Sequence, residues 1–514
     1  VSATLAELCR AEFLLCGDGA ANEYAFKHPV TKRVAYESQL RARRAVVHGR
    51  VAEVLAATPG AVQHDAALIA HHFELAERRT DAARWSIHAA EVAGGWDSAQ
   101  TMRHLHKVRE LAGSSPERSE LRDLAVGAGV RALAFGVFAG IERSEADRIF
   151  SQTRALIADE PSNALAALHA WYSNWLDNAE QPDAGEHARR AQELAEASHH
   201  PRALLDVAWA VLRYLSDAGQ LREAVEFGER ALARVDPARA SSLVTRGQIA
   251  NTHLQLSQYL GLLGRPHASI AAAERAEALA NALHDPQGPV IAARVKSSAA
   301  RLLGRVDDEL RFALDAVERA QQWENPLQRL ICGLVFARAL LSHCRLDEAR
   351  VQIEHVEARI GSEPAELTPT SGRRVWLALA GMRLVVRAEL ELASGDVVEA
   401  LRYAELAHEH MRERARLYPP YRADVWRVLA RALIQRDASA HAERSAEVIA
   451  ELEAVVRDCE LGSYVPLLHE LRAEYACALG DERTRARELT NARSAFLELG
   501  AELQVARLDR MKLG

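Results

Sequence analysis

The feature that most constrains this chain is a recurring pair of helices joined by a short turn. An apolar helix, a turn at Gly or a polar residue, and a second helix repeat along the sequence. A weaker copy turns at Arg78. The clear copies turn at Gly219, Gly264, Gly304, Cys344, Gly395, Asp437 and Gly480. A self-similar unit of this size predicts a stacked helical array rather than one compact core.

Small residues recur at fixed distances from these turns. Seven positions before the turn the residue is small in six of the seven clear copies, and a small residue such as Ala224 or Ala400 often stands five positions after it. Small side chains at a fixed phase let paired helices approach closely. Aromatic residues make up only 5% of a chain rich in Ala, Leu, Glu and Arg, which also favours helix. We therefore predict an all-α fold, a right-handed α-solenoid of helix hairpins.

Charge and cysteine content limit the class of partner. The 514 residues carry a net charge of −7, which argues against nucleic acid as the default partner. The six cysteines show no C-x-x-C spacing, so we expect neither disulfides nor a zinc site, and a reducing, cytoplasmic location. The sequence shows neither a signal peptide nor an apolar run long enough to span a membrane, so we expect no membrane partner.

The motifs of common catalytic sites are missing. The sequence contains no G-x-x-x-x-G-K-[ST] phosphate loop, no G-x-S-x-G elbow and no H-E-x-x-H metal motif. No two of its 21 histidines stand three or four residues apart, the spacing that places both rings on one helix face. We predict that this chain alone is not an enzyme and that it holds no catalytic residue, no metal and no cofactor.

The N-terminal segment differs from the repeats. Residues 12–16 and 23–27 flank the turn signal Asp18-Gly19 and predict a small β-hairpin, with helices following at about 30–40 and 42–57. This arrangement fits the remnant of a winged-helix module. Its basic residues could contact DNA, or they could form a solvated or interdomain face, and we favour the second interpretation. These residues are Lys27, Lys32, Arg33, Arg41, Arg43, Arg44 and Arg50.

The predicted domains follow from these patterns. Residues 1–57 form the winged-helix remnant and connecting helices, 58–112 the first helical hairpins, and 113–514 the repeat solenoid. Breaks rich in Gly, Pro and Ser predict loops between units, at 113–116, 160–163, 285–289, 361–372 and 419–420.

The units resemble tetratricopeptide repeats, with two departures. The usual aromatic of the first helix is largely replaced by Leu, and successive turns lie 40 to 51 residues apart, against about 34 in the standard unit. The spacing implies longer helices and loops.

A second resemblance covers residues 24–110 strongly and the rest of the chain more weakly. Phe26-Lys27-His28-Pro29, the following Val34-Ala35-Tyr36-Glu37 and Ala70-His71-His72 resemble the segment between the ATPase core and the repeat arm in bacterial STAND-type ATPase signalling proteins. The likeness is greatest to members that carry a class III adenylate or guanylate cyclase domain. A start at Val1, without Met, fits a C-terminal piece of such a protein.

The resemblance implies a sensor or scaffold arm. Its partners would be a protein segment or small-molecule effector in the groove and its own upstream ATPase module, and oligomerisation stays open. The alternative is the repeat arm of a STAND-type transcriptional activator whose DNA-binding module lies outside this chain.

Repeat geometry indicates where such a partner would bind. Positions six, ten and thirteen before each turn share one face of the first helix, which lines the concave wall of a solenoid. We expect the side chains on this face to be exposed. They should be basic to neutral in the first four units and acidic in the last unit, through Glu470 and Glu474. An acidic partner should therefore bind nearer the N-terminal half of the groove. Simple solvent exposure would also make this face polar. The candidate groove residues are Trp209, Arg213, Asn251, Gln258, Arg294, Ser298, Arg338, Arg427 and Arg431.

Overall fold

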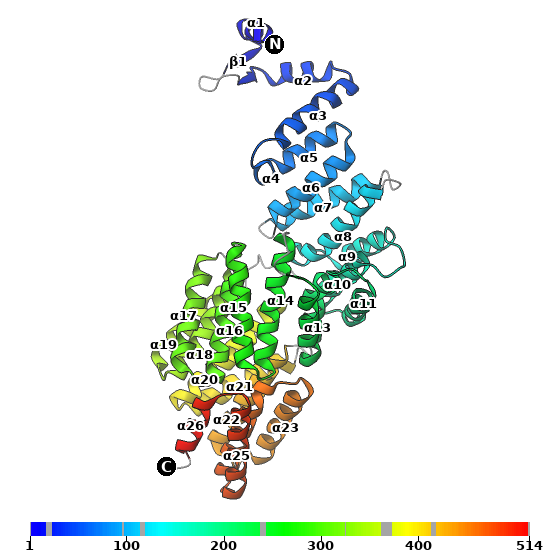
Figure 1. The fold of residues 1–514 in the computed structure, drawn as a ribbon. Helices are drawn as coiled ribbons and strands as arrows, with labels where there is room; N and C mark the ends of the chain where they lie inside the picture. The colour runs from blue at the N-terminus through cyan, green and yellow to red at the C-terminus, as the bar shows by residue number, and fades with distance from the viewer. Residues whose placement is uncertain are drawn as a thin grey trace. The chain divides into compact units, whose positions relative to one another are not determined.

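Helices make up nearly all of the described chain, beside one short pair of strands. The architecture is that of a computed structural model, which describes residues 2–16, 23–94, 97–113, 119–236, 243–323, 325–360, 373–412 and 418–511. Two compact units, Val1–Phe135 and Gly136–Gly514, divide the chain (Figure 1). The domain boundaries drawn from the sequence at 57/58 and 112/113 stay a prediction.

The first unit begins with the predicted β-hairpin. Strands β1 (Leu14–Cys16) and β2 (Tyr24–Phe26) are antiparallel, with Leu15 opposite Ala25. The hairpin is therefore confirmed, whereas its turn at Asp18-Gly19 lies outside the described residues. The helices predicted after it are α2 and α3. The helices that begin in this unit are α1 (Ser2–Arg10), α2 (Pro29–Glu37), α3 (Arg41–Ala56), α4 (Ala61–His64), α5 (Ala66–Leu75), α6 (Arg79–Ala93), α7 (Ser98–Gly113) and α8 (Ser119–Ala139).

The second unit is a succession of antiparallel helix pairs, the tetratricopeptide-like solenoid expected from the sequence. In each pair the first helix has an even label from α10 to α24. The elements are α9 (Arg143–Arg154), α10 (Asn163–Asn178), α11 (Ala184–Ala197), α12 (Ala203–Asp217), α13 (Leu221–Ala233), α14 (Leu243–Leu262), α15 (Pro266–Ala282), α16 (Gln287–Leu302), α17 (Val306–Gln322), α18 (Pro326–Ser342), α19 (Leu346–Ile360), α20 (Arg373–Ser394), α21 (Val397–Arg412), α22 (Pro419–Asp437), α23 (Ala442–Asp458), η2 (Gly462–Tyr464), α24 (Val465–Ala478), α25 (Glu482–Glu498) and α26 (Glu502–Met511).

Left-handed backbone marks most of the predicted turns. Five of the seven clear turns have a Gly at positive φ, and Cys344 adopts the same conformation with φ 57°. The other two predicted turns are present without a left-handed residue at the predicted position: α22 ends at Asp437, and Arg78 lies between α5 and α6, where Glu77 has the positive φ. The sequence reading also missed the hairpin of α10 and α11, which turns at Glu180 with φ 56°.

The small residues near the turns lie where paired helices touch. Ala224 and Ala400 are fully buried, which confirms the packing logic behind the repeat. Glu309 stands at the same place after Gly304, and it too is only 2% exposed. A carboxyl therefore replaces a small side chain at one helix contact.

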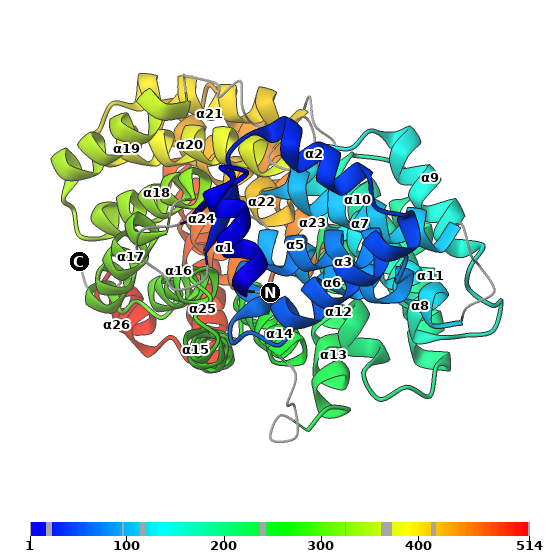
Figure 2. The same ribbon diagram turned by 90° about the horizontal axis from the view of Figure 1, so that it is seen from above.

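The first helices form an inner layer of the second unit. Each packs on its own partner and on the next first helix, from α10 through α24. In the described part of the chain no comparable packing joins consecutive second helices. Seen from above, α16, α18 and α20 lie nearer the centre than α17, α19 and α21 (Figure 2). The first helices thus line the concave wall, as the repeat geometry predicts.

The C-terminal helices of the second unit return to its earlier hairpins. The backbone N–H of Arg222 donates to Glu460 Oε2 over 2.8 Å, and Gln504 Nε2 donates to the Arg301 carbonyl over 3.2 Å, across 238 and 203 residues of sequence. A Cβ added at Gly462 would lie 2.3 Å from the Leu263 carbonyl oxygen. Glycine permits this close backbone approach.

Some predicted loops contain helix. Pro419-Pro420 begins α22 instead of forming a loop, because Pro fits the first turn of a helix, where its missing N–H costs nothing. The stretch 285–289 likewise gives way to α16 at Gln287. The segment 361–372 and most of 113–116 lie outside the described residues. Over the ranges that the structure covers, no helix combines the length and the apolar character needed to cross a bilayer.

Candidate functional site

All nine candidate groove residues lie on first helices of the second unit. Ser298 is exposed and the other eight are half-buried. The structure thus places them in the same inner layer, while their role in binding stays a prediction. They come from α12 (Trp209, Arg213), α14 (Asn251, Gln258), α16 (Arg294, Ser298), α18 (Arg338) and α22 (Arg427, Arg431).

Two of the predicted docking arginines belong to a buried ion-pair network. Arg338 Nε lies 2.8 Å from Glu389 Oε2 and its Nη2 lies 2.7 Å from Asp424 Oδ2. Arg427 also pairs with Glu389, and Tyr464 donates its hydroxyl proton to Asp424 over 3.1 Å. Burial opposes ionisation of Glu389, but the two guanidinium groups hold its pKa well below the ordinary value. Both arginine side chains are only 13% exposed, so the expectation of free, exposed charges was wrong for them.

Two further candidate arginines also have carboxylate partners. Arg213 Nη2 lies 3.4 Å from Asp177 Oδ2, and Arg431 Nε donates to Glu474 Oε2 over 2.8 Å. Each partner comes from the neighbouring first helix. The predicted acidic end of the groove is also wrong in charge balance, because Glu474 and Glu470 are neutralised by Arg431 and by Arg507 of α26.

The inner wall between α14 and α18 differs from these regions because several of its polar side chains have no carboxylate or amide partner in the part of the chain that the structure describes. The structure gives the side-chain amides of Asn251 and Gln258 no hydrogen-bond partner among the described residues, and Gln255 Oε1 is buried without one. Arg294 donates from Nη1 to Gln328 Oε1 over 2.7 Å, but its Nε is buried and unpaired. Burial lowers the pKa of Arg294 because no carboxylate offsets the loss of hydration. In the described chain, this stretch therefore holds two buried polar atoms without a partner, Gln255 Oε1 and Arg294 Nε, beside the half-buried amides.

A cavity of about 710 Å³ lies where the last helix meets the α16–α17 turn. It has the size of a small-molecule site and mixes arginines with apolar side chains. Its lining is formed by Gly304, Val306, Ser342, Arg427, Arg431, Leu467, Glu470, Leu503, Gln504, Ala506, Arg507 and Arg510.

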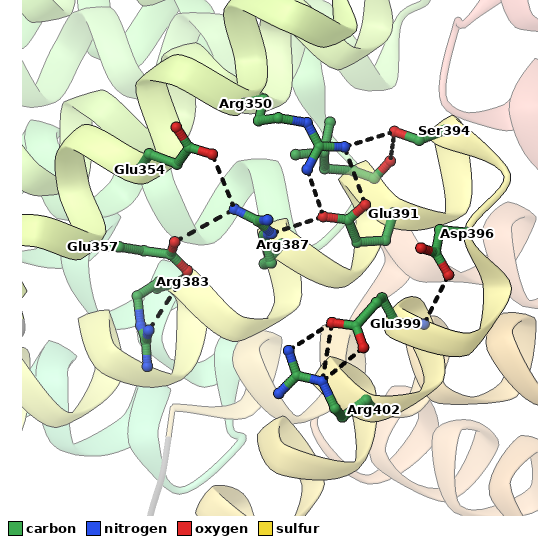
Figure 3. A network of polar contacts seen from close by, with 11 residues as sticks. Arg350, Glu354, Glu357, Arg383, Arg387, Glu391, Ser394, Asp396, Glu399 and Arg402 are labelled. Atoms are coloured by element: carbon green, nitrogen blue, oxygen red, sulfur yellow. Dashed lines mark hydrogen bonds and ion pairs between the residues drawn. The ribbon is translucent and has the colours of Figure 1, made fainter.

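A separate ion-pair network holds neighbouring pairs together. Glu391 of α20, whose side chain is 5% exposed, accepts a hydrogen bond from Arg350 of α19 over 3.0 Å and forms an ion pair with Arg387 at 2.8 Å (Figure 3). Arg387 continues the network to Glu357 at 3.4 Å. These residues link α19 to α20 and leave no charge unmatched, so we assign them to packing.

Two histidine pairs form between helices, a relationship that spacing within one helix could not reveal. His48 and His72 approach to 2.8 Å between their Nδ1 atoms, and His169 and His187 to 3.0 Å. Burial lowers the pKa of all four rings, that of His169 to about 4. Within the described ranges no three His, Cys, Asp or Glu side chains come together as a metal site requires.

No family model matches the chain, and no curated protein matches its sequence. A solved Rap protein complexed with Competence and Sporulation Factor is similar, with a TM-score of 0.55 and 11% identity over 74% of this chain and 99% of that one. The likeness is one of fold.

A second solved structure with a similar fold is that of a signal-transduction ATPase. It is a Signal Transduction ATPase with Numerous Domains (STAND) protein with a tetratricopeptide repeat sensor, from Pyrococcus horikoshii. Its TM-score is 0.50 at 12% identity, over 80% of this chain. The chain spans 58% of the length of that protein.

Proposed function

We propose that this chain is the effector-binding arm of a larger signalling protein and that it binds an extended peptide segment on the inner wall of α14 to α18. By itself it is a cytoplasmic binding module and not an enzyme. The observation that carries the proposal is the row of side-chain amides on that wall. Asn251 and Gln258 are half-buried and bond to no other described residue, and Gln255 Oε1 is buried without a partner. A side-chain amide offers both a donor and an acceptor, and so does each peptide unit of an extended segment.

Two fold relatives support the proposal. The Rap protein was solved with Competence and Sporulation Factor bound, and the archaeal STAND protein carries its repeats as a sensor. The resemblance of residues 24–110 to the connecting segment of cyclase-linked STAND ATPases supports a bacterial protein with an upstream ATPase module and a nucleotide cyclase.

The first unit offers a surface for such a module. Helices α2 and α3 and the residue between them expose large apolar side chains to solvent: Val30 60%, Val34 60%, Leu40 80%, Val47 48%, Val51 36% and Val54 70%. Apolar side chains concentrated on two consecutive helices are typical of an interaction surface. We propose that the ATPase module covers them.

Selection from a displayed peptide library on the immobilised chain tests the binding function. Ser298→Trp places a bulky ring on the exposed inner face of α16, and Ala268→Trp does the same on the exposed start of α15. We expect selected peptides to bind at least tenfold more weakly to the first variant and as well as the parent to the second. Selection of nothing, or equal binding by both variants, would contradict the proposal.

A further inference from the structure

Helix α16 carries a polar strip on its inner side. Arg294, Ser298 and Arg301 are spaced by four and three residues, which places them on one helix face. Ser298 is exposed and both arginines are half-buried. We call these three residues the α16 strip.

The arginines of the α16 strip lack carboxylate partners. Among the described residues, Arg294 forms a hydrogen bond with the Gln328 amide and no ion pair, and the Arg301 side chain forms neither. The nearby carboxylate of Glu389 is already held by Arg338 and Arg427.

One more acid lies close to the strip. Glu309 is 2% exposed, and burial raises its pKa although Arg301 opposes the shift. Among the described contacts it accepts a hydrogen bond from Ser342 over 3.3 Å and forms no ion pair with either arginine of the strip. Within the described residues, neither arginine of the strip thus forms an ion pair, on a wall where Arg213, Arg338, Arg427 and Arg431 are all paired.

We infer that the α16 strip binds two carboxylates of an acidic peptide, one at Arg294 and one at Arg301, with the Ser298 hydroxyl between them. The inference rests on the proposed peptide-binding function and names the chemistry of its partner. A guanidinium with free N–H groups matches a carboxylate in charge and in its fork of donors, and partial burial strengthens the pairing.

Helix geometry sets the spacing of the two carboxylates. Seven residues of helix separate Arg294 from Arg301, a rise of about 10 Å. A peptide in the polyproline II conformation returns to the same side every third residue, after roughly 9 Å. The partner should therefore carry acidic residues three positions apart.

The probe is a fluorescein-labelled, proline-rich heptapeptide with Glu at its second and fifth positions, compared with an analogue carrying Gln at both. Binding to the full chain is followed by fluorescence polarisation. We expect the Gln analogue to bind at least tenfold more weakly. Arg294→Gln and Arg301→Gln should each weaken the Glu peptide at least fivefold, whereas Arg483→Gln, at an exposed arginine of α25, should leave it unchanged.

A urea melt of each variant separates binding from folding. Arg294→Gln removes a desolvated charge that has no carboxylate partner, so its unfolding midpoint should not fall below that of the parent. A lower midpoint would make Arg294 a structural residue and overturn the inference. Equal affinities of the Glu and Gln peptides, no binding of either, or indifference to both arginine changes would also overturn it. Selected library peptides that bind more weakly to Ser298→Trp, and yet bind equally well with Glu or Gln in their sequence, would support the proposed peptide-binding function and contradict this inference.

Discussion

Arg338 of α18 donates two hydrogen bonds to the carboxylate of Glu389 on α20, over 2.8 and 3.0 Å. The same guanidinium reaches Asp424 of α22, so one side chain connects three successive first helices. The pair therefore ties the inner layer together where the sequence suggested a docking residue. Because both partners are largely desolvated, the network is stable only while every charge keeps its partner.

Arg338→Leu should lower the free energy of unfolding by about 3–5 kcal/mol, the usual cost of leaving a buried charge unpaired. Urea melts measure the effect. Arg431→Leu is the matched control, because its pair with Glu474 has 34% and 39% of the two side chains exposed and should contribute no more than about 1 kcal/mol. Equal losses in the two variants would mean that the Arg338 network does not hold the helices.

Gly462→Ala should weaken the return of the C-terminal helices to the α14–α15 turn. The added Cβ would lie 2.3 Å from the Leu263 carbonyl oxygen, so one of the two backbone segments must move. Hydrogen exchange should become faster at the Arg222 amide of α13, which bonds to Glu460, two residues before Gly462 in the same loop. Gly247→Ala meets no atom within 4 Å on α14 and should be neutral or stabilise by about 0.5–1 kcal/mol. Unchanged exchange in Gly462→Ala would show that the contact is loose.

The sequence predicted the repeat because its determinants are local. Turn glycines and the alanines after them sit within one hairpin, and a fixed phase is visible without knowing the stack. Even the missed hairpin at Glu180 carried part of this signal, with Ser173 seven positions before it and Gly185 five after it. What the sequence could not show is which charges meet between hairpins.

Charge pairing depended on residues far apart in the chain. Arg338 and Asp424 are 86 residues apart, and Arg507 reaches Glu470 from a helix that was not counted in the groove. In the sequence, a row of polar residues on one helix face has the same pattern whether those residues bind a ligand or pair with side chains of the next helix. Only the three-dimensional structure distinguishes the arginines that pair with carboxylates from Arg294 and Arg301.

Ala224→Asp or Ala400→Asp should destabilise the solenoid by several kcal/mol, at the high end for single changes, because each alanine is fully buried at a helix contact and no partner awaits a charge there. Urea melts test it. Ala268→Asp, on the exposed first turn of α15, should change stability by no more than about 0.5 kcal/mol. Midpoints of the buried variants within error of the parent would remove these alanines from the helix contacts.

The His169–His187 pair should make the second unit less stable in acid. Burial, together with the positive charge on His187, Arg190 and Arg154, lowers the pKa of His169 to about 4 from the ordinary 6.5. The unfolded chain therefore binds more protons than the folded one between these values, so stability present above pH 6.5 is lost as the pH falls toward 4. The loss is at most about 3 kcal/mol for this group. Thermal melts from pH 7.5 to 4 should show a shallower decline for His169→Leu, since its neutral side chain cannot take up the proton. Parallel declines in parent and variant would mean that the ring titrates as freely in the folded protein as in the unfolded one.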